Sequence, residues 1–380
     1  MTGFIKTAGA DGLRSGFSTG AYAAATAVAA WRRLQGQPFM TPLPLRFADG
    51  RTRDIAVAGV ALHAEDRAES WAVKDGGDDI DITDQALIRA QVSRAAGLQP
   101  RPEDFVENCG AATLILRGGM GVGLVKRAGL DVPPGKWAIN PTPRAMIGDN
   151  LRHAGAGDHK EPLLIEISVD NGAELAIRTL NPLLGIDGGL SILGTSGLVI
   201  PCSNVAYRET IRVLIRGAAA AGTKRLALVT GGRTHGWLRR IDPHLAEYAI
   251  FRIGDFIREA LEICAGQGIP RVTIGCMAGK LAKYALGHAN THAHQVALDM
   301  AAVLHLLGTR GFSYDQSLGG RNFSSFREFL ESLAEPEQKQ AVAILAREAG
   351  GLFRQWAPDL EVEILVFNPG GELFSKDTGS

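Results

Sequence analysis

A glycine-rich stretch in the middle of the chain constrains the fold more than any other segment. It runs from Thr179 to Ser203 and reads TLNPLLGIDGGLSILGTSGLVIPCS. The glycines, the Asn-Pro near its start and the proline near its end exclude both a long helix and a central strand. Apolar residues occupy the intervals between the glycines, and a solvated linker would not carry them. We therefore expect a buried connector between two folded halves, either a packed interdomain loop or a place where backbone approaches a ligand.

The composition is that of a folded protein with a small-molecule ligand. The 380 residues are 46% hydrophobic, which is enough for two sizeable cores, and 40 basic residues balance 40 acidic ones. This balance argues against nucleic-acid or membrane-surface binding and permits a homodimer without requiring one. The chain shows neither a signal-peptide core nor a membrane-spanning apolar run, so we expect a cytoplasmic protein. The four cysteines lack CxxC spacing, which indicates reduced thiols.

The segments before the connector predict an α+β half with antiparallel strand pairs. The alanine-rich run after Ser18 predicts a helix that ends near Gly36, and Asp49-Gly50 predicts the turn of a hairpin. We expect a further helix from Asp84 to Ala96. We also expect a second hairpin in which Asn171-Gly172 joins the strands LLIEISVD and ELAIRTL.

Two segments of this half are candidates for chemistry. KDGGDDIDIT, which begins at Lys74, gathers carboxylates that repel one another unless a cation or several hydrogen-bond donors lie among them. It does not fit an EF-hand, and it is either a polar turn or the source of an acid or base, for which Asp75 is the candidate. GGMGVG, which begins at Gly118, resembles a phosphate cradle but lacks the ending of a P-loop.

After the connector, strands alternate with glycine-rich turns and helices. A helix over 207–220 precedes the strand RLALVT and the turn Gly231-Gly232, and a helix over 254–265 precedes the strand RVTIG. Helices over 291–307 and 322–350 and the strand EVEILVF complete the chain. This order predicts a parallel, Rossmann-like α/β sheet that binds its ligands at the carboxyl ends of the strands.

Three histidines lie close together in the second half, at His288, His292 and His294. The first two are four residues apart, as helical metal ligands can be, but no carboxylate or cysteine completes a known motif. We therefore expect no metal site and interpret His292 as a residue near the substrate or a helix cap. A GxSxG motif is absent from the sequence, so a hydrolase is not supported.

Several sequence blocks follow one another in the order of a known family. In the first half they are RSGFSTG at 14–20, VKDGGDDIDIT at 73–83, GGMGVGLVKRAGL at 118–130, AINPTPR at 138–144 and NPLLGIDGGLSILGTSG at 181–197. In the second half they are TGGRT at 230–234, GDFI at 254–257, GKLAKYALG at 279–287 and NTH at 290–292. Together they resemble the cobalt-precorrin-5B C1-methyltransferases of cobalamin biosynthesis, the CbiD type. The chain departs from the family at Ala21-Tyr22, Arg258 and Ala293, which bears on substrate detail more than on reaction class.

The resemblance implies transfer of a methyl group from S-adenosylmethionine to C-1 of a tetrapyrrole, either cobalt-precorrin-5B or its cobalt-free counterpart. It also implies two domains. Residues 1–190 are expected to form an α+β domain similar to ribosomal protein S5 domain 2, and residues 191–380 a Rossmann-like α/β domain. Two rival functions are a non-catalytic tetrapyrrole carrier and a small-molecule kinase that uses GGMGVG for phosphates.

Roles for individual residues follow from this reading as expectations. The cofactor is expected at Thr230, Gly231, Gly232, Asp255, Gly275 and Gly279. The tetrapyrrole, with its many carboxylates, is expected at Arg14, Lys74, Arg144, Asp187, Gly188, Gly189, Thr195, Arg233 and Lys280. His292 and Asp75 are the candidates for proton handling. The sulfonium is already activated, so positioning and exclusion of water should supply most of the rate.

Overall fold

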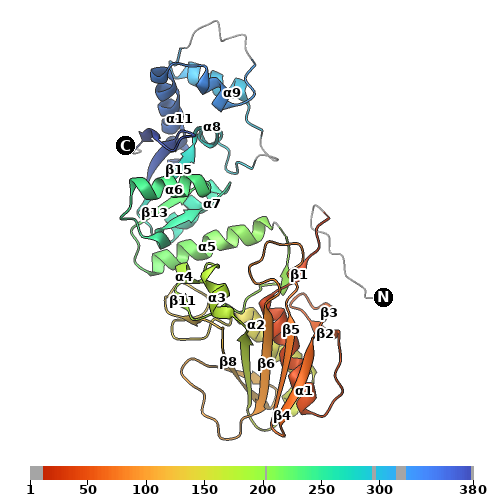
Figure 1. The fold of residues 1–380 in the computed structure, drawn as a ribbon. Coiled ribbons are helices and arrows are strands. Elements are labelled where there is room, and N and C mark those ends of the chain that lie inside the picture. The colour runs from red at the N-terminus through yellow and green to blue at the C-terminus, as the bar shows by residue number, and fades with distance from the viewer. Residues whose placement is uncertain (1–11, 202, 293–296, 314–321, 378–380) are drawn as a thin grey trace. The chain divides into compact units, whose positions relative to one another are not determined.

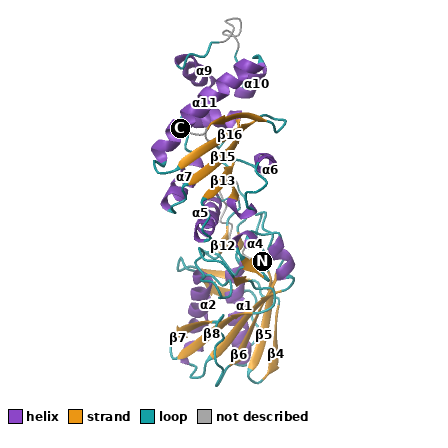
Figure 2. Cartoon of the chain, turned by 90° about the vertical axis from the view of Figure 1, so that its left-hand side faces the viewer, coloured by secondary structure: helices purple, strands orange, loops and turns teal. Residues whose placement is uncertain are grey.

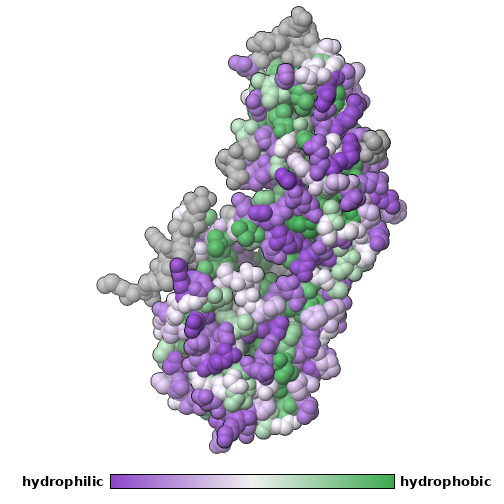
Figure 3. Space-filling model, turned by 180° about the vertical axis from the view of Figure 1, so that it is seen from behind, coloured by the Kyte–Doolittle hydropathy of each residue, from purple (hydrophilic) through white to green (hydrophobic). Residues whose placement is uncertain are grey.

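The computed structural model describes residues 12–201, 203–292, 297–313 and 322–377. Contacts divide the chain into two compact units, residues 1–204 and residues 205–380, which we call unit 1 and unit 2. The protein has an α/β fold with mixed sheets. On the face drawn in Figure 3, hydrophobic surface is scattered between hydrophilic areas in both units. No helix among the described residues combines the length and the apolar character that a membrane crossing requires.

The boundary between the units lies after the connector and not at residues 190/191, where the sequence placed it. The last part of the connector stays with unit 1, because strand β12 (Leu198–Val199) pairs with β1 (Gly16–Phe17). Ile192 is also fully buried in the core of unit 1. The connector therefore contributes its apolar residues to the first half only.

A six-stranded sheet forms the centre of unit 1 (Figure 1). In spatial order its strands are β4 (Gly59–Ala64), β5 (Arg67–Val73), β6 (Leu87–Arg94), β10 (Leu163–Val169), β8 (Ala112–Gly118) and β7 (Phe105–Cys109). Neighbouring strands are antiparallel except for β10 and β8, which are parallel. Helices α1 (Thr19–Leu34) and α2 (Pro141–His153) pack on each other, and α1 contacts β4, β5 and β6. The alanine-rich sequence of α1 gives it a small side-chain surface that fits this close packing.

Smaller elements complete unit 1. They are the hairpin of β2 (Leu43–Arg46) and β3 (Thr52–Ile55), the pair of β9 (Leu124–Val125) and β11 (Ile186–Asp187), the helices α3 (Gly172–Ile177) and α4 (Asn181–Leu184), and the 3-10 helix η1 (Ala156–Asp158). The hairpin around Asp49-Gly50 is confirmed, and so is the alanine-rich helix after Ser18, whose side chain caps α1 by accepting a hydrogen bond from the backbone of Ala21.

Two elements of unit 1 differ from the prediction. The segment expected as a helix from Asp84 to Ala96 is strand β6, whose alternate residues Ile88, Ala90 and Val92 are buried against α1. The first four residues of the segment ELAIRTL belong to α3, and the segment does not form the second strand of a hairpin. Strand β10 already has β6 on one edge and β8 on the other, so no edge is left for a hairpin partner. The sequence of this segment alone does not reveal that both edges of β10 are already paired with other strands.

Unit 2 contains a five-stranded sheet. In spatial order its strands are β14 (Ile250–Arg252), β13 (Arg225–Val229), β15 (Arg271–Met277), β16 (Glu361–Phe367) and β17 (Leu373–Asp377). Its helices are α5 (Asn204–Ala220), α6 (Gly232–Ile241), α7 (Ile257–Gly266), α8 (Ala278–Ala285), α9 (Met300–Thr309), α10 (Phe326–Glu331) and α11 (Glu335–Trp356), with the 3-10 helix η2 (Glu247–Ala249). The first four strands are parallel, and β17 is antiparallel to β16. Figure 2 shows α6 on one side of this sheet and α7 on the other.

The predicted succession of strand, glycine turn and helix is present in unit 2, with one shifted helix. The helix expected over 291–307 begins only at Met300, where the side chain of Asp299 caps its first turn. His294 lies outside the described residues. Strands β14 and β17 were not expected from the sequence. Both are short strands at the edges of the sheet, where hydrophobic patterning is weak.

Candidate functional site

Most of the sequence blocks of the first half meet at one end of the unit 1 sheet. Strands β5, β8 and β10 run in the same direction, so the segments that follow them emerge at the same end. These segments and the connector form a surface that we call the unit 1 rim, made of residues 14–20, 74–86, 119–127 and 170–200. In Figure 1 it carries the labels α3, α4, β11 and β1.

Backbone contacts fix the connector along this rim. The amide of Leu190 donates to the carbonyl of Gly121 (2.9 Å), and the amide of Gly123 donates to the carbonyl of Leu190 (2.8 Å). Further along, the amide of Ser18 donates to the carbonyl of Gly197 (2.9 Å). The connector is therefore built into the rim and holds the start of α1 against the GGMGVG loop.

The connector residues expected at the ligand differ in their exposure. Asp187, Gly188 and Thr195 are exposed on the rim, and Asp187 pairs with Leu124 across the β9–β11 ribbon. Gly189 is buried, and a Cβ added there would lie 2.3 Å from the carbonyl oxygen of Gly121. Close packing of two backbones explains the glycine at this position without a ligand.

Three amides of the GGMGVG loop donate to carbonyls of the protein itself. The amide of Gly119 donates to Ile167 (2.8 Å), that of Val122 to Gly119 (3.2 Å), and that of Gly123 to the connector. A phosphate cradle requires backbone N–H groups that point at the ligand. Much of the loop's backbone is thus used for packing within the protein, which weakens the support for a kinase.

Two carboxylates of the acidic loop 74–86, those of Asp81 and Asp84, accept hydrogen bonds from donors of the loop itself. Lys74 is 1% exposed, and its Nζ donates to Oδ2 of Asp81 at 2.6 Å. Asp81 accepts two more hydrogen bonds from Thr83 through Oδ1, and Asp84 accepts the amide of Gly76 at 2.7 Å. No group of side chains that could hold a metal ion occurs in the described part of the chain. Lys74 is thus a buried partner of Asp81 and not a surface anchor for substrate carboxylates.

Arg14 and Asp75 form a bidentate ion pair beside this loop. Guanidinium NH1 and NH2 of Arg14 lie 2.5 and 2.8 Å from the two carboxylate oxygens of Asp75. The hydrogen bond from Arg14 lowers the pKa of Asp75 and outweighs the opposing effect of partial burial. Asp75 is therefore ionised at neutral pH but a weak base, which counts against a role in removing protons.

Tyr22, which the sequence analysis noted only as a departure from the family, supports the same pair. Its hydroxyl accepts a hydrogen bond from the amide of Asp75 (3.0 Å), and its ring packs edge-on against Phe17. Burial raises the pKa of Tyr22 to about 12, so the phenol stays neutral. Only the departure from family sequence marked this residue before the structure was known.

Arg144 lies apart from the Arg14–Asp75 pair. It forms an ion pair with Glu107 of the edge strand β7, and its guanidinium carbon sits 4.0 Å from the ring centre of Phe105. The structure therefore does not bring Arg144 together with Arg14 and Lys74, although the three were expected to share one ligand.

The second group of candidate residues lies at the carboxyl ends of the unit 2 strands. The strand order reverses at β13, because the chain adds β14 on one side of it and β15 on the other. Ligands of open α/β sheets bind at such a reversal. Thr230 to Gly232 follow β13, and Gly279 and Lys280 begin the helix after β15. We call this group the strand-end site.

Asp255 is the centre of a polar cluster in the strand-end site. Nζ of Lys280 donates to its Oδ1 (2.8 Å) and to the carbonyl of Gly254 (2.7 Å), while the hydroxyl of Thr291 donates to the same Oδ1 (2.7 Å). Burial acts to raise the pKa of Asp255, but these hydrogen bonds outweigh it and lower the pKa. His292 follows directly and interacts electrostatically with the carboxylate. Lys280 is therefore already paired with Asp255, and its expected role as an anchor for a substrate carboxylate stays a prediction.

The glycines of the strand-end site leave room beside the backbone. An added Cβ at Gly231 or Gly279 would meet no atom within 4 Å, and one at Gly232 would only touch the Arg252 guanidinium at 3.7 Å. Gly275 is different, because its Cβ would press on Val229 at 3.0 Å inside the sheet. The first three glycines thus fit a cofactor that approaches the backbone, whereas the packing of the sheet explains Gly275. Arg233 is exposed on the first turn of α6.

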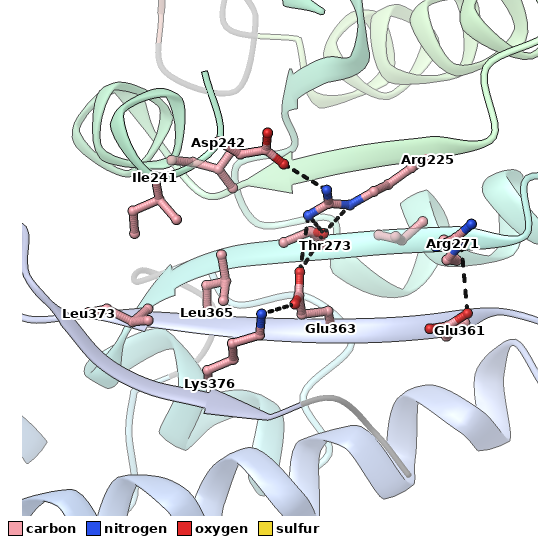
Figure 4. A pocket seen from close by; sticks show the side chains of 12 residues that line it. Arg225, Ile241, Asp242, Arg271, Thr273, Glu361, Glu363, Leu365, Leu373 and Lys376 are labelled. Atoms are coloured by element: carbon pink, nitrogen blue, oxygen red, sulfur yellow. Dashed lines mark hydrogen bonds and ion pairs between the residues drawn. The ribbon is translucent and has the colours of Figure 1, made fainter. Parts of the chain in front are cut away.

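A cavity of about 430 Å³ lies elsewhere in unit 2, toward the amino ends of the strands (Figure 4). Arg225 and Arg271, which begin β13 and β15, are part of its lining. Arg225 binds Asp242 (2.6 Å) and Glu363 (3.2 Å), so these charges compensate one another. None of the residues expected to bind cofactor or substrate lines this cavity.

The fold is that of an α/β protein with mixed sheets, and its candidate ligand site is at the strand reversal of the second unit. A family model described as CbiD matches residues 6–201. A cobalt-precorrin-5B C(1)-methyltransferase of Geobacillus sp. (strain WCH70) is 34% identical over 96% of this chain and 96% of its own, and one of Geobacter sulfurreducens is 36% identical over 93% and 96%. The chain therefore belongs to the CbiD family.

A solved structure is also similar. It is the cobalamin biosynthesis protein (cbiD) from Archaeoglobus fulgidus, with 25% identity over 74% of this chain and 84% of that one. The TM-score is 0.38, which is too low to transfer the positions of residues.

Proposed function

We propose that the protein transfers a methyl group to C-1 of cobalt-precorrin-5B, or of its cobalt-free counterpart, in corrin ring biosynthesis. The names of the relatives, which align over nearly the whole chain, support this activity. The structural observation that carries the proposal is the strand-end site, where open glycine turns flank the strand reversal of unit 2. We also propose that unit 2 is Rossmann-like and that unit 1 is similar to ribosomal protein S5 domain 2.

S-adenosylmethionine is the proposed methyl donor, and it supplies a methyl group already activated on a sulfonium. The backbone at Gly231, Gly232 and Gly279 has room to contact it closely. Asp255 follows β14, where an acidic side chain of such folds binds ribose hydroxyls. Lys280 and Thr291 both bind its Oδ1, and among the described residues Oδ2 has no hydrogen-bond partner. That oxygen is our proposed acceptor for a hydroxyl of the donor.

The tetrapyrrole is proposed to bind on the unit 1 rim, which carries the exposed residues Asp187, Gly188 and Thr195. His292 is the proposed proton-handling group, because Asp75 is held as a weak base by Arg14. The protein's own contribution to methyl transfer is to hold the two reactants in line and to exclude water. Neither task demands a strongly basic side chain.

The test is methyl transfer from isotopically labelled S-adenosylmethionine to precorrin-5B, with and without cobalt, by the purified protein. Label in the tetrapyrrole is the expected result, and the two substrates together identify the metal state. Tight binding of pigment without any transfer of label would favour the carrier and refute the enzyme.

The placement of the donor is tested separately by calorimetry with Gly232→Trp. We expect this variant to lose affinity for S-adenosylmethionine, because the indole would fill the space beside the turn. Gly236→Trp is the matched control, since Gly236 lies one turn further along α6 and is also open. Unchanged affinity in Gly232→Trp would show that the donor binds elsewhere.

A further inference from the structure

The unit 1 cations that the sequence suggested as carboxylate anchors are already paired with carboxylates of the protein. Arg14 binds Asp75 in bidentate geometry, and Lys74 is buried on Asp81. Arg144 binds Glu107. A substrate carboxylate would have to displace a protein carboxylate and leave it without its cation, which cancels much of the gain.

Two other basic side chains of the rim are available. Lys126 and Arg178 are exposed, and neither forms an ion pair or a side-chain hydrogen bond with any described residue. Glu174 and Asp187 lie on neighbouring elements, but neither of them pairs with these cations among the described residues. A ligand carboxylate can therefore bind Lys126 and Arg178 without breaking an existing pair.

Backbone contacts place these two cations on either side of the short helix α4. Arg178 directly follows α3 and lies three residues before the start of α4, and the amide of Lys126 donates to the carbonyl of Gly185 directly after α4 (2.8 Å). The side chain of Arg127 packs on Gly185 and donates to the carbonyl of Leu183, which fixes this part of the loop. Four residues of helix measure about 6 Å, so the cations can reach two carboxylates of one ligand.

Apolar side chains project beside the cations. Ile177 is 75% exposed and precedes Arg178, and Met120 is 71% exposed at the tip of the GGMGVG loop. That loop touches the start of α3, because the backbones of Gly121 and Gly172 are in contact. Among the large apolar residues described in unit 1, only Ile80 is more exposed than these two. Cations beside exposed apolar groups suit a ligand that is both apolar and anionic.

We propose that Lys126 and Arg178 anchor carboxylates of the tetrapyrrole, while Met120 and Ile177 contact the apolar part of its ring. The proposal rests on the proposed function for the identity of the ligand. It replaces Arg14, Lys74 and Arg144 as the anchors in unit 1. These residues bind the ligand in the ground state, so their loss raises KM and changes kcat little.

The test is the double variant Lys126→Gln/Arg178→Gln. Each lost charge-assisted contact weakens binding about tenfold, so we expect KM for the tetrapyrrole to rise by roughly 10- to 100-fold. The dependence of KM on salt should also weaken. The control is Arg67→Gln/Lys160→Gln, which removes two exposed cations that have no partner among the described residues. Arg67 begins β5 and Lys160 lies just before β10, so both are at the end of the sheet opposite to the rim. All four side chains are exposed, so the unfolding midpoint serves as a check that every variant is folded.

Two measurements separate failure of this proposal from failure of the proposed function. Absorbance titration reports tetrapyrrole binding by itself, and label transfer reports the reaction. A wild-type protein that transfers no label would refute the function. A wild type that transfers label, with a double variant whose KM and binding match those of the control, would overturn the assignment of Lys126 and Arg178.

Discussion

Replacement of Lys74 by methionine tests whether one buried ammonium group holds the acidic loop of unit 1 together. The side chain of Lys74 is 1% exposed and that of its partner Asp81 is 20% exposed. Methionine keeps the apolar stem but removes the charge, so the carboxylate loses its cation while it stays largely buried. Removal of one member of a buried ion pair costs about 3–5 kcal/mol. We expect the lower end of this range, because Thr83 still donates two hydrogen bonds of 2.7 Å to Asp81.

The assay is thermal unfolding of the full chain, followed by a fluorescent probe attached to unit 1. For a unit of this size, a loss of about 3 kcal/mol lowers the melting temperature by roughly 6–12 °C. The control is Lys339→Met, which breaks the exposed pair of Lys339 and Glu335 on α11 and should leave the probe's transition unchanged.

The pH dependence gives a second, independent check. Burial acts to raise the pKa of Asp81, but the hydrogen bonds from Lys74 and Thr83 outweigh it and lower the pKa in the folded protein. The stabilisation from this lowered pKa is present above the ordinary pKa of an aspartate and is lost as the pH falls toward the folded-state value. The difference in stability between Lys74→Met and the wild type should therefore persist from pH 7 down to the ordinary pKa of an aspartate and shrink only below it. Equal stability of Lys74→Met and the wild type at pH 7 would refute this account of the loop, and so would a stability difference that does not change with pH.

Two further substitutions probe other contacts of the rim. Gly189→Ala should destabilise unit 1 by about 1–3 kcal/mol or more, because the new Cβ would lie 2.3 Å from the carbonyl oxygen of Gly121. The unfolding midpoint measures this, and Gly236→Ala, at an open position, should change it little. Tyr22→Phe removes the acceptor for the amide of Asp75 and should cost about 1–3 kcal/mol. Hydrogen exchange at that amide should become faster, and an unchanged rate would contradict the role given to Tyr22.

Sequence reasoning succeeded where short-range patterns determine the structure. The helix after Ser18 and the hairpin at Asp49-Gly50 follow from capping and turn preferences, which act within a few residues. It failed for β6 and α3, where tertiary contacts override local preference. Whether ELAIRTL becomes a strand depends on a free sheet edge, and both edges of β10 are occupied by distant segments.

For the candidate site, too, the sequence could not reveal contacts between residues that are far apart along the chain. The blocks that carry the family resemblance were visible in the sequence, and those of the first half lie largely on the unit 1 rim. The sequence did not show which cations were already paired. Arg14 lies 61 residues from its partner Asp75, and Arg144 lies 37 residues from Glu107, so only the folded chain reveals these pairs. A cation such as Lys126, which has no partner in the described part of the chain, cannot be recognised by its residue type alone.

The surroundings of the glycines differ between the two units. In unit 1, a Cβ at Gly16 would lie 2.1 Å from the backbone of Gly76, and one at Gly121 would lie 2.0 Å from the carbonyl oxygen of Val169. These glycines let backbone pack on backbone, so ligand contacts of the rim must come from side chains that project out of it. At Gly231 and Gly279 in unit 2, an added Cβ would meet no atom of the described residues within 4 Å, so a ligand has room beside the backbone there. We infer that unit 1 recognises a polycarboxylate through side chains, whereas unit 2 recognises the methyl donor largely through its backbone.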